Sequence, residues 1–158
     1  MSWSGSMTDP RDLLRVHEEA ITTPVGFDAG VWFIGRIRTP WTDRSECPRG
    51  GDAEAGPLCT IELAEPWVPA LQGIAEKTRL QVLYWMHLAR RDAVRQNPSF
   101  SDRSIGTFAI RSPLRPNPIA SSIVRLIAVD GPVLTVRGLD CIDGTPLIDL
   151  KPEFGACA

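Results

Sequence analysis

The sequence predicts a single all-β domain, built as a sandwich or a barrel. Short runs of β-forming residues follow one another closely, turn residues separate them, and no G-x-G-x-x-G turn joins a strand to a helix. The length of 158 residues suits one domain of ordinary size. An apolar fraction of 43% and a charged fraction of 23% are typical of globular proteins, which excludes a mainly disordered or coiled-coil chain.

A short helix is expected near the N-terminus, over residues 11–20. These residues follow a capping candidate and Pro10, which suits the first turn of a helix. Residues 21–30 contain Thr, Pro and Gly and indicate a linker. We therefore expect residues 1–30 to form a helix and linker appended to a domain of residues 31–155.

The strands are expected where β-branched and aromatic residues gather between turn residues. The clearest hairpin lies between Ser122 and Arg137, where two such runs flank the turn pair Asp130-Gly131. A second Asp-Gly pair, Asp143-Gly144, precedes another short run. The other expected strands are residues 31–38, 59–63, 80–86, 106–110 and 147–150.

Three segments are expected as loops. Residues 42–57 are polar and rich in Pro and Gly, which indicates a long exposed loop of the kind that often has a functional role. Residues 90–103 are polar and charged. Residues 111–119 contain three prolines, which remove amide donors at close intervals and predict a rigid irregular loop. Such a loop could aim its polar side chains at a ligand.

The charge pattern gives no global attraction to nucleic acid, because the formal net charge is -2. Of the 17 basic residues, 15 are Arg, and the two lysines are Lys77 and Lys151. Arginine forms bidentate contacts with phosphate and carboxylate, so this bias suits RNA or an anionic ligand. A GC-rich genome would produce the same bias.

Neither a metal site nor a membrane segment is expected. The cysteines at 47, 59, 141 and 157 stand far apart without a C-x-x-C pair, which is typical of free thiols in a reducing compartment. No apolar stretch approaches the roughly 20 residues of a membrane helix, and the N-terminus lacks the pattern of a signal peptide. We therefore expect a cytoplasmic protein.

Residues 106–119, Gly-Thr-Phe-Ala-Ile-Arg-Ser-Pro-Leu-Arg-Pro-Asn-Pro-Ile, closely resemble a signature of the TsaA-like (YaeB) family of tRNA methyltransferases. The resemblance begins at Ile34 to Pro40 and covers most of the chain. It continues through Gly138-Leu139-Asp140, Asp143-Gly144-Thr145-Pro146 and Asp149-Leu150-Lys151-Pro152.

The resemblance implies a small antiparallel β-barrel, usually a homodimer, that binds S-adenosylmethionine without a Rossmann domain. It also implies methylation of N6 of N6-threonylcarbamoyladenosine, next to the anticodon of tRNA, with no metal. The positions that match the family's cofactor site are Pro48, Arg49, Gly50, His87, Leu88, Arg111, Ser121, Asp143, Gly144, Thr145 and Pro146.

Methyl transfer needs the sulfonium and the attacking nitrogen held close together and in line. The target nitrogen is acylated and therefore a poor nucleophile, so removal of its proton would assist the attack. Asp143, Asp140 and His87 are candidates for the group that accepts this proton. Each also has a structural interpretation; Asp143, for example, could be a turn residue only.

The substrate would meet a second set of residues, Arg115, Asn117 and Lys151. Arg115 could bind tRNA phosphate or only brace its loop through backbone carbonyls, and Lys151 could form a structural salt bridge instead. The sequence also departs from the family at residues 77–81, which read Lys-Thr-Arg-Leu-Gln where an aromatic-Ser-His-Leu-Trp run is usual. Two alternatives therefore stay open: an S-adenosylmethionine-binding barrel that methylates another substrate, and a sensor module without catalysis.

Overall fold

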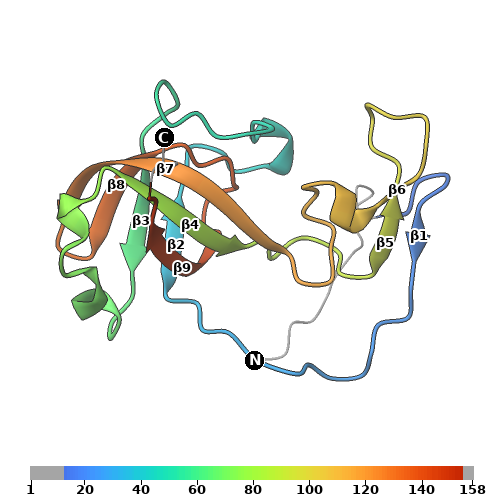
Figure 1. Ribbon diagram of the computed structural model, residues 1–158, viewed down its shortest axis with the longest axis horizontal. Helices are drawn as coiled ribbons and strands as arrows, with labels where there is room; N and C mark the ends of the chain where they lie inside the picture. Colours follow the sequence, from blue (N-terminus) through green and yellow to red (C-terminus); the bar gives the residue numbers. More distant parts are fainter. Residues whose placement is uncertain (1–12, 155–158) are drawn as a thin grey trace. The chain divides into compact units, whose positions relative to one another are not determined.

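A computed structural model describes residues 13–154, and the chain divides into two compact units (Figure 1). The described part of the smaller unit comprises residues 13–28 and 88–118. The larger unit comprises residues 29–87 and 119–154. Residues 88–118 connect two strands of the larger unit, but they cluster with residues 13–28.

The larger unit is a closed six-stranded antiparallel barrel, which confirms the all-β prediction and the barrel that the family resemblance implies. Its strand order is β2-β3-β8-β7-β4-β9 (Figure 1). The strands are β2 (Gly35–Arg38), β3 (Cys59–Leu63), β4 (Arg79–Trp85), β7 (Ile119–Asp130), β8 (Val133–Arg137) and β9 (Pro146–Pro152). Closure leaves no unpaired strand edge within this sheet.

Along the strands, buried side chains alternate with less buried ones, and the buried side chains fill the barrel. In β4, buried residues alternate with half-buried ones, and β3 shows the same pattern. The inward positions include Ile37, Ile61 and Leu134, which are fully buried aliphatic side chains. Burial of each such side chain stabilises the fold by about 1.5–3 kcal/mol. The predicted hairpin is also confirmed, since β7 pairs with β8 across the turn at Gly131, whose φ is 55°.

The three single-turn 3-10 segments of the barrel unit lie in its connections. They are η2 (Arg44–Glu46), η3 (Val68–Leu71) and η4 (Ile74–Glu76). η2 lies in the predicted long loop, whereas η3 and η4 form the connection from β3 to β4. In the described part of the chain, no helix is long and apolar enough to span a membrane.

The smaller unit contains a three-stranded sheet, β1 (Glu19–Ala20), β5 (Ala93–Gln96) and β6 (Ile105–Gly106), followed by η5 (Thr107–Ala109). The helix predicted over residues 11–20 is wrong for residues 13–20, which contain a turn and β1. Residues 11 and 12 lie outside the described part. The physical reason is pairing: residues 19 and 20 are held by β5, a strand in a segment that the sequence predicts as loop.

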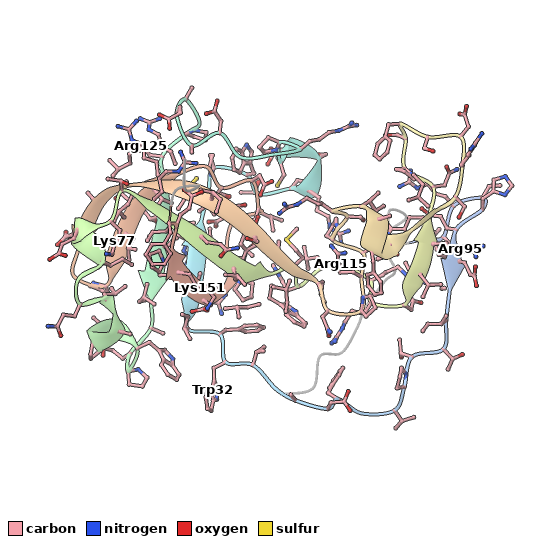
Figure 2. All side chains as sticks on the ribbon, in the orientation of Figure 1. Trp32, Lys77, Arg95, Arg115, Arg125 and Lys151 are labelled. Atoms are coloured by element: carbon pink, nitrogen blue, oxygen red, sulfur yellow. The ribbon has the colours of Figure 1, made fainter. Side chains whose placement is uncertain are left out.

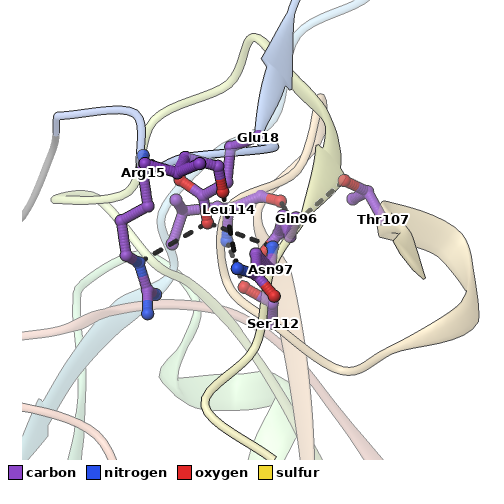
Figure 3. Close-up of polar contacts among 8 residues, drawn as sticks. Arg15, Glu18, Gln96, Asn97, Thr107, Ser112 and Leu114 are labelled. Carbon is purple, nitrogen blue, oxygen red and sulfur yellow. Dashed lines mark hydrogen bonds and ion pairs between the residues drawn. The ribbon is translucent and has the colours of Figure 1, made fainter. Parts of the chain in front are cut away.

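Polar side chains stabilise the interior of the smaller unit (Figure 3). The Gln96 amide is buried and donates to the Thr107 hydroxyl at 2.9 Å and to the Leu114 carbonyl at 2.7 Å. The Thr107 hydroxyl in turn donates to the carbonyl of Ala93 at 2.9 Å. These bonds connect β5 to the proline-rich loop, which is neither helix nor strand over residues 111–118, as its prolines predict.

We predict that Gly51→Ala destabilises the barrel, whereas Gly50→Ala does not. A Cβ at Gly51 would overlap the carbonyl oxygen of Gly138, while a Cβ at Gly50 would meet no atom within 4 Å. The expected loss for Gly51→Ala is about 1–3 kcal/mol in the free energy of unfolding, measured by chemical denaturation. Equal stability of the two variants would contradict this close packing of backbones.

Candidate functional site

The antiparallel barrel gathers alternate connections at one end, which we call the loop end. Because successive strands reverse direction, the ends of β2, β4 and β8 and the starts of β3, β7 and β9 share this end. Residues 39–58 and 138–145 are two of its connections, and His87 follows β4 there. Of the predicted cofactor residues, all those in the barrel unit lie in these connections or in the adjoining strands.

The Asp143 carboxylate joins two of these connections. Its Oδ1 accepts the backbone N–H of Thr39 at 3.1 Å, and its Oδ2 lies 3.7 Å from the Arg38 guanidinium. The Asp143 backbone N–H donates to the carbonyl of Trp41 at 2.7 Å. Both carboxylate oxygens are therefore engaged, which makes Asp143 better suited to fixing the geometry of the loop end than to accepting a proton.

The residues that follow Asp143 also hold this connection against β2. The backbone N–H of Gly144 donates to the carbonyl of Ile37 at 2.8 Å, and its φ of 81° favours glycine. Thr145 is fully buried, and its hydroxyl donates to the Ile142 carbonyl at 2.6 Å. Pro146 begins β9 opposite Arg36 of β2. The predicted cofactor turn is thus rigidly held against the end of β2.

Pro48, Arg49 and Gly50 are exposed, but the segments on either side of them are fixed. On one side, Asp43 and Glu46 form a capping box around η2, in which the Asp43 carboxylate accepts the Ser45 N–H at 2.8 Å. On the other side, the backbone at residue 51 packs against residue 138. This arrangement presents residues 48–50 to solvent from a well-defined loop.

His87 is a titratable group of the loop end whose pKa is lowered. Burial lowers the pKa of His87 below its usual 6.5, and the positive charges of Arg36 and Arg44 lower it further, against an opposing hydrogen bond to the Trp85 backbone. The imidazole is therefore neutral at pH 7 and able to accept a proton. The two arginines provide positive charge beside it.

Asp140, the third candidate base, belongs to a polar cluster with Tyr84 and Ser122. The Tyr84 hydroxyl donates to Asp140 Oδ1 at 2.7 Å and lies 2.8 Å from the Ser122 hydroxyl. The Tyr84 side chain is only 2% exposed, and its burial, together with the adjacent carboxylate, raises its pKa. The hydroxyl therefore stays protonated and orients the carboxylate.

Sequence reasoning did not identify Tyr84 or Ser122. One signal was available: Tyr84 is the single tyrosine of the chain and takes an inward position in an otherwise apolar alternation. A buried tyrosine hydroxyl nearly always needs a partner.

Ser121 lies near the start of β7, and its hydroxyl accepts a hydrogen bond from the Gln81 amide at 3.0 Å. Gln81 belongs to the segment that departs from the family pattern. In the β4–β9 register Gln81 pairs with Lys151, whose ammonium lies 2.6 Å from the Asp149 carboxylate. Lys151 is near the C-terminal end of β9, so it lies toward the end of the barrel opposite the loop end.

Leu88, Arg111, Arg115 and Asn117 belong to the smaller unit. The Arg115 guanidinium donates to the carbonyls of Thr107 and Ile110, both at 3.4 Å, as expected for a residue that braces its loop. Arg91, which the sequence did not single out, donates to the Pro116 carbonyl at 2.6 Å and to Asn117 Oδ1 at 3.2 Å.

Arg91 also stacks over Phe27, with its guanidinium carbon 4.7 Å from the ring centroid. Arg111 and Leu88 are exposed. The smaller unit thus presents these two side chains from a braced loop and from the segment that follows β4.

The three cysteines in the described residues are free thiols. Burial raises the pKa of Cys141 to about 12 and that of Cys59 to about 11. Both thiols are therefore protonated at neutral pH and are poor nucleophiles. Among the residues that the structure describes, no group of three His, Cys, Asp or Glu side chains is arranged to hold a metal.

Comparison with known proteins places these features in a family. The model of the tRNA-methyltransferase O N-terminal domain matches residues 36–157. VirR of Rhizobium radiobacter, described as a probable S-adenosyl-L-methionine-binding protein, is 50% identical over 140 residues, which cover 89% of this chain and 79% of VirR. An S-adenosyl-L-methionine-binding protein of Archaeoglobus fulgidus is 36% identical over 118 residues, 75% of this chain and 84% of that protein.

Solved structures give the same result for the fold. The crystal structure of TrmO from Pseudomonas aeruginosa matches with a TM-score of 0.67 and 30% identity, over 84% of this chain and 60% of that chain. A further TrmO structure matches with a TM-score of 0.70 and 30% identity. This chain therefore spans about three-fifths of the solved chains that it resembles.

We predict that Tyr84→Phe lowers the free energy of unfolding by about 1–3 kcal/mol, because it removes a donor from the partly buried Asp140 carboxylate while keeping the shape of the side chain. Ser122→Ala should cost less, since the Tyr84 hydroxyl keeps its shorter bond to Asp140. Chemical denaturation measures both variants. A Tyr84→Phe protein as stable as the wild type would contradict the role of this hydroxyl.

We also predict that the barrel loses stability as pH falls below about 6.5, in part through His87. Because the pKa of His87 is lowered in the folded state, the unfolded chain binds this proton first, and each unit of lowering costs about 1.4 kcal/mol at low pH. His87→Gln should flatten this part of the pH profile of unfolding. His17→Gln, at the exposed second histidine, is the control, and equal flattening by both would contradict the prediction.

Proposed function

The chain belongs to the tRNA-methyltransferase O N-terminal domain family, and we propose that it transfers a methyl group from S-adenosylmethionine to tRNA. The specific acceptor that we propose is N6 of N6-threonylcarbamoyladenosine, next to the anticodon. The main structural support is that one end of the barrel holds a fixed turn, an exposed fixed loop and a neutral histidine, contributed by separate parts of the chain. A preorganised site of this kind is what alignment of donor and acceptor requires.

S-adenosylmethionine carries a carboxylate, a sulfonium and an adenine, and the loop end offers chemistry suited to each. Arg36 and Arg44 supply positive charge for a carboxylate beside His87. The Asp140 carboxylate supplies negative charge suited to a sulfonium. We propose that the cofactor contacts Pro48, Arg49, Gly50, His87, Leu88, Arg111, Ser121, Asp143, Gly144, Thr145 and Pro146.

For the proton transfer we favour His87 among the three candidates. The acceptor nitrogen would attack the methyl carbon, the carbon–sulfur bond would break with its electron pair moving to sulfur, and the nitrogen's proton would pass to the imidazole. The lowered pKa of His87 keeps it able to accept that proton at pH 7. Asp143 is engaged on both oxygens, and Asp140 is held by Tyr84, so we assign them positioning roles.

The remaining parts of the proposal concern the assembly. We propose that Arg115, Asn117 and Lys151 contact the RNA, and that the protein is a homodimer, as the family resemblance implies. We also propose that it acts in the cytoplasm. The helix and linker of residues 1–30, in which residues 13–20 are not helical, would be an appendage to the barrel domain.

One observation favours a second candidate function. VirR, which shares half of its aligned residues with this chain, has the name of a binding protein and not that of a methyltransferase. The second candidate is therefore a barrel that binds S-adenosylmethionine and either methylates a different substrate or acts as a sensor without transfer.

Calorimetric titration with S-adenosylmethionine tests the cofactor proposal. We expect saturable binding by the wild-type protein and binding weakened about tenfold or more in Arg111→Ala, because a charge-assisted contact is lost. Arg95→Ala is the control, because Arg95 is an exposed arginine of the same unit that pairs with Glu19 (Figure 2). Absence of binding by the wild type would contradict the proposed function.

Incubation with the cofactor and bulk tRNA, followed by mass analysis of the nucleosides, tests the transfer. Threonylcarbamoyladenosine heavier by one methylene unit would establish the proposed reaction, and His87→Gln should then lower the rate more than it weakens cofactor binding. Binding without any methylated nucleoside would favour the sensor function. Methylation of another nucleoside would favour a different substrate.

A further inference from the structure

A groove of the barrel unit lies away from the loop end. It has a volume of about 620 Å³ and lies between η3, η4 and the C-terminal half of β9. We call it the far groove. Its volume is within the range of small-ligand sites in proteins. Its lining includes Trp67, Gln72, Lys77, Leu80, Asp149 and Lys151.

Both lysines of the chain line the far groove, although they are far apart in sequence (Figure 2). Lys151 is paired with Asp149 at 2.6 Å. Lys77 is exposed and forms no ion pair with any described residue, and the other acidic residue of the lining is Glu76. The far groove therefore presents one ammonium that is available to an anion.

The far groove also has an aromatic side chain in its lining. Trp67 lines the far groove, and its ring lies 5.7 Å from that of Trp32 at an angle of 39°. The Trp32 side chain is 77% exposed, so the aromatic surface continues outward from the far groove. Apolar side chains such as Leu71 and Leu80 complete the lining.

A planar apolar group attached to an anion matches this combination. Bases of single-stranded RNA stack on aromatic side chains, while lysine ammonium groups contact the phosphates that join them. Gln72, which also lines the far groove, offers a donor and an acceptor suited to a base edge. A nucleotide satisfies the aromatic, polar and cationic parts of the lining together.

We propose that the far groove binds one unstacked nucleotide of the RNA substrate, with its base on Trp67 and its phosphate at Lys77. The inference rests on the proposed function, in which RNA is the substrate. β4 runs for seven residues between the two ends of the barrel, a length of about 20 Å. The nucleotide in the far groove is therefore a different one from the nucleotide that is methylated, and this contact selects and orients the RNA.

The test is fluorescence anisotropy of a fluorescein-labelled single-stranded oligoadenylate, titrated with the whole chain at several salt concentrations. Trp67→Leu should weaken binding about tenfold or more, because a stacking surface is lost. Lys77→Gln should reduce the slope of log affinity against log salt by about 0.7, the value for one phosphate contact on single-stranded nucleic acid. Lys77 is exposed, so this variant keeps the fold even where Trp67→Leu weakens packing.

Arg125→Gln is the matched control, because Arg125 is an exposed cation of the same barrel that pairs with Glu54 and does not line the far groove (Figure 2). It should change neither affinity nor salt slope. Unchanged affinity in Trp67→Leu together with an unchanged slope in Lys77→Gln would overturn the proposal, even where the wild type methylates tRNA. Conversely, weakened oligonucleotide binding in a protein that does not bind S-adenosylmethionine would support the far groove and contradict the proposed methyl donor alone.

Discussion

Antiparallel closure of six strands is the constraint on which the rest of this structure depends. Closure pairs every strand on both sides, and reversal of direction at each step assigns every connection to one of two ends. The long connection after β2 and the turn before β9 therefore lie at the same end and meet there, although Thr39 and Asp143 are 104 positions apart in the sequence. The Asp143 carboxylate, in the turn before β9, accepts a hydrogen bond from the backbone N–H of Thr39 in the long connection and so holds the two connections together.

The same closure determines which polar groups are buried. Aliphatic side chains occupy most inward positions, and the exception, Tyr84, is compensated by Asp140 and Ser122. These two partners come from β7 and from the segment after β8, so their contact with β4 depends on the pairing of β4 with β7 and of β7 with β8. At the loop end, burial and neighbouring arginines keep His87 neutral. Packing thus supplies both the rigidity and the proton chemistry that the proposed reaction needs.

The two ends of the barrel differ in charge and surface. The loop end combines carboxylates, arginines and a neutral imidazole, whereas the opposite end offers tryptophans and an available lysine ammonium. An enzyme that acts on a large RNA benefits from this division, because binding energy obtained far from the reacting atoms can orient the substrate. The divergent segment of residues 77–81 contributes to both ends, through Lys77 in the far groove and through the bond from Gln81 to Ser121.

The sequence by itself determined the local features: the alternating strands, the hairpin at Asp130-Gly131, the irregular proline-rich loop and the motifs that identify the family. These depend on neighbouring residues, so a single chain segment encodes them. Only the tertiary structure decided the rest, including the pairing of residues 19 and 20 with β5 where a helix was predicted. It also decided the engagement of Asp143, the partner of Tyr84 and the placement of Lys77 and Lys151 in the lining of one groove. Each of these arrangements involves residues far apart in the chain. Pairing of the strands in the barrel or in the small sheet brings these residues together, whereas the conformational preference of a single segment does not.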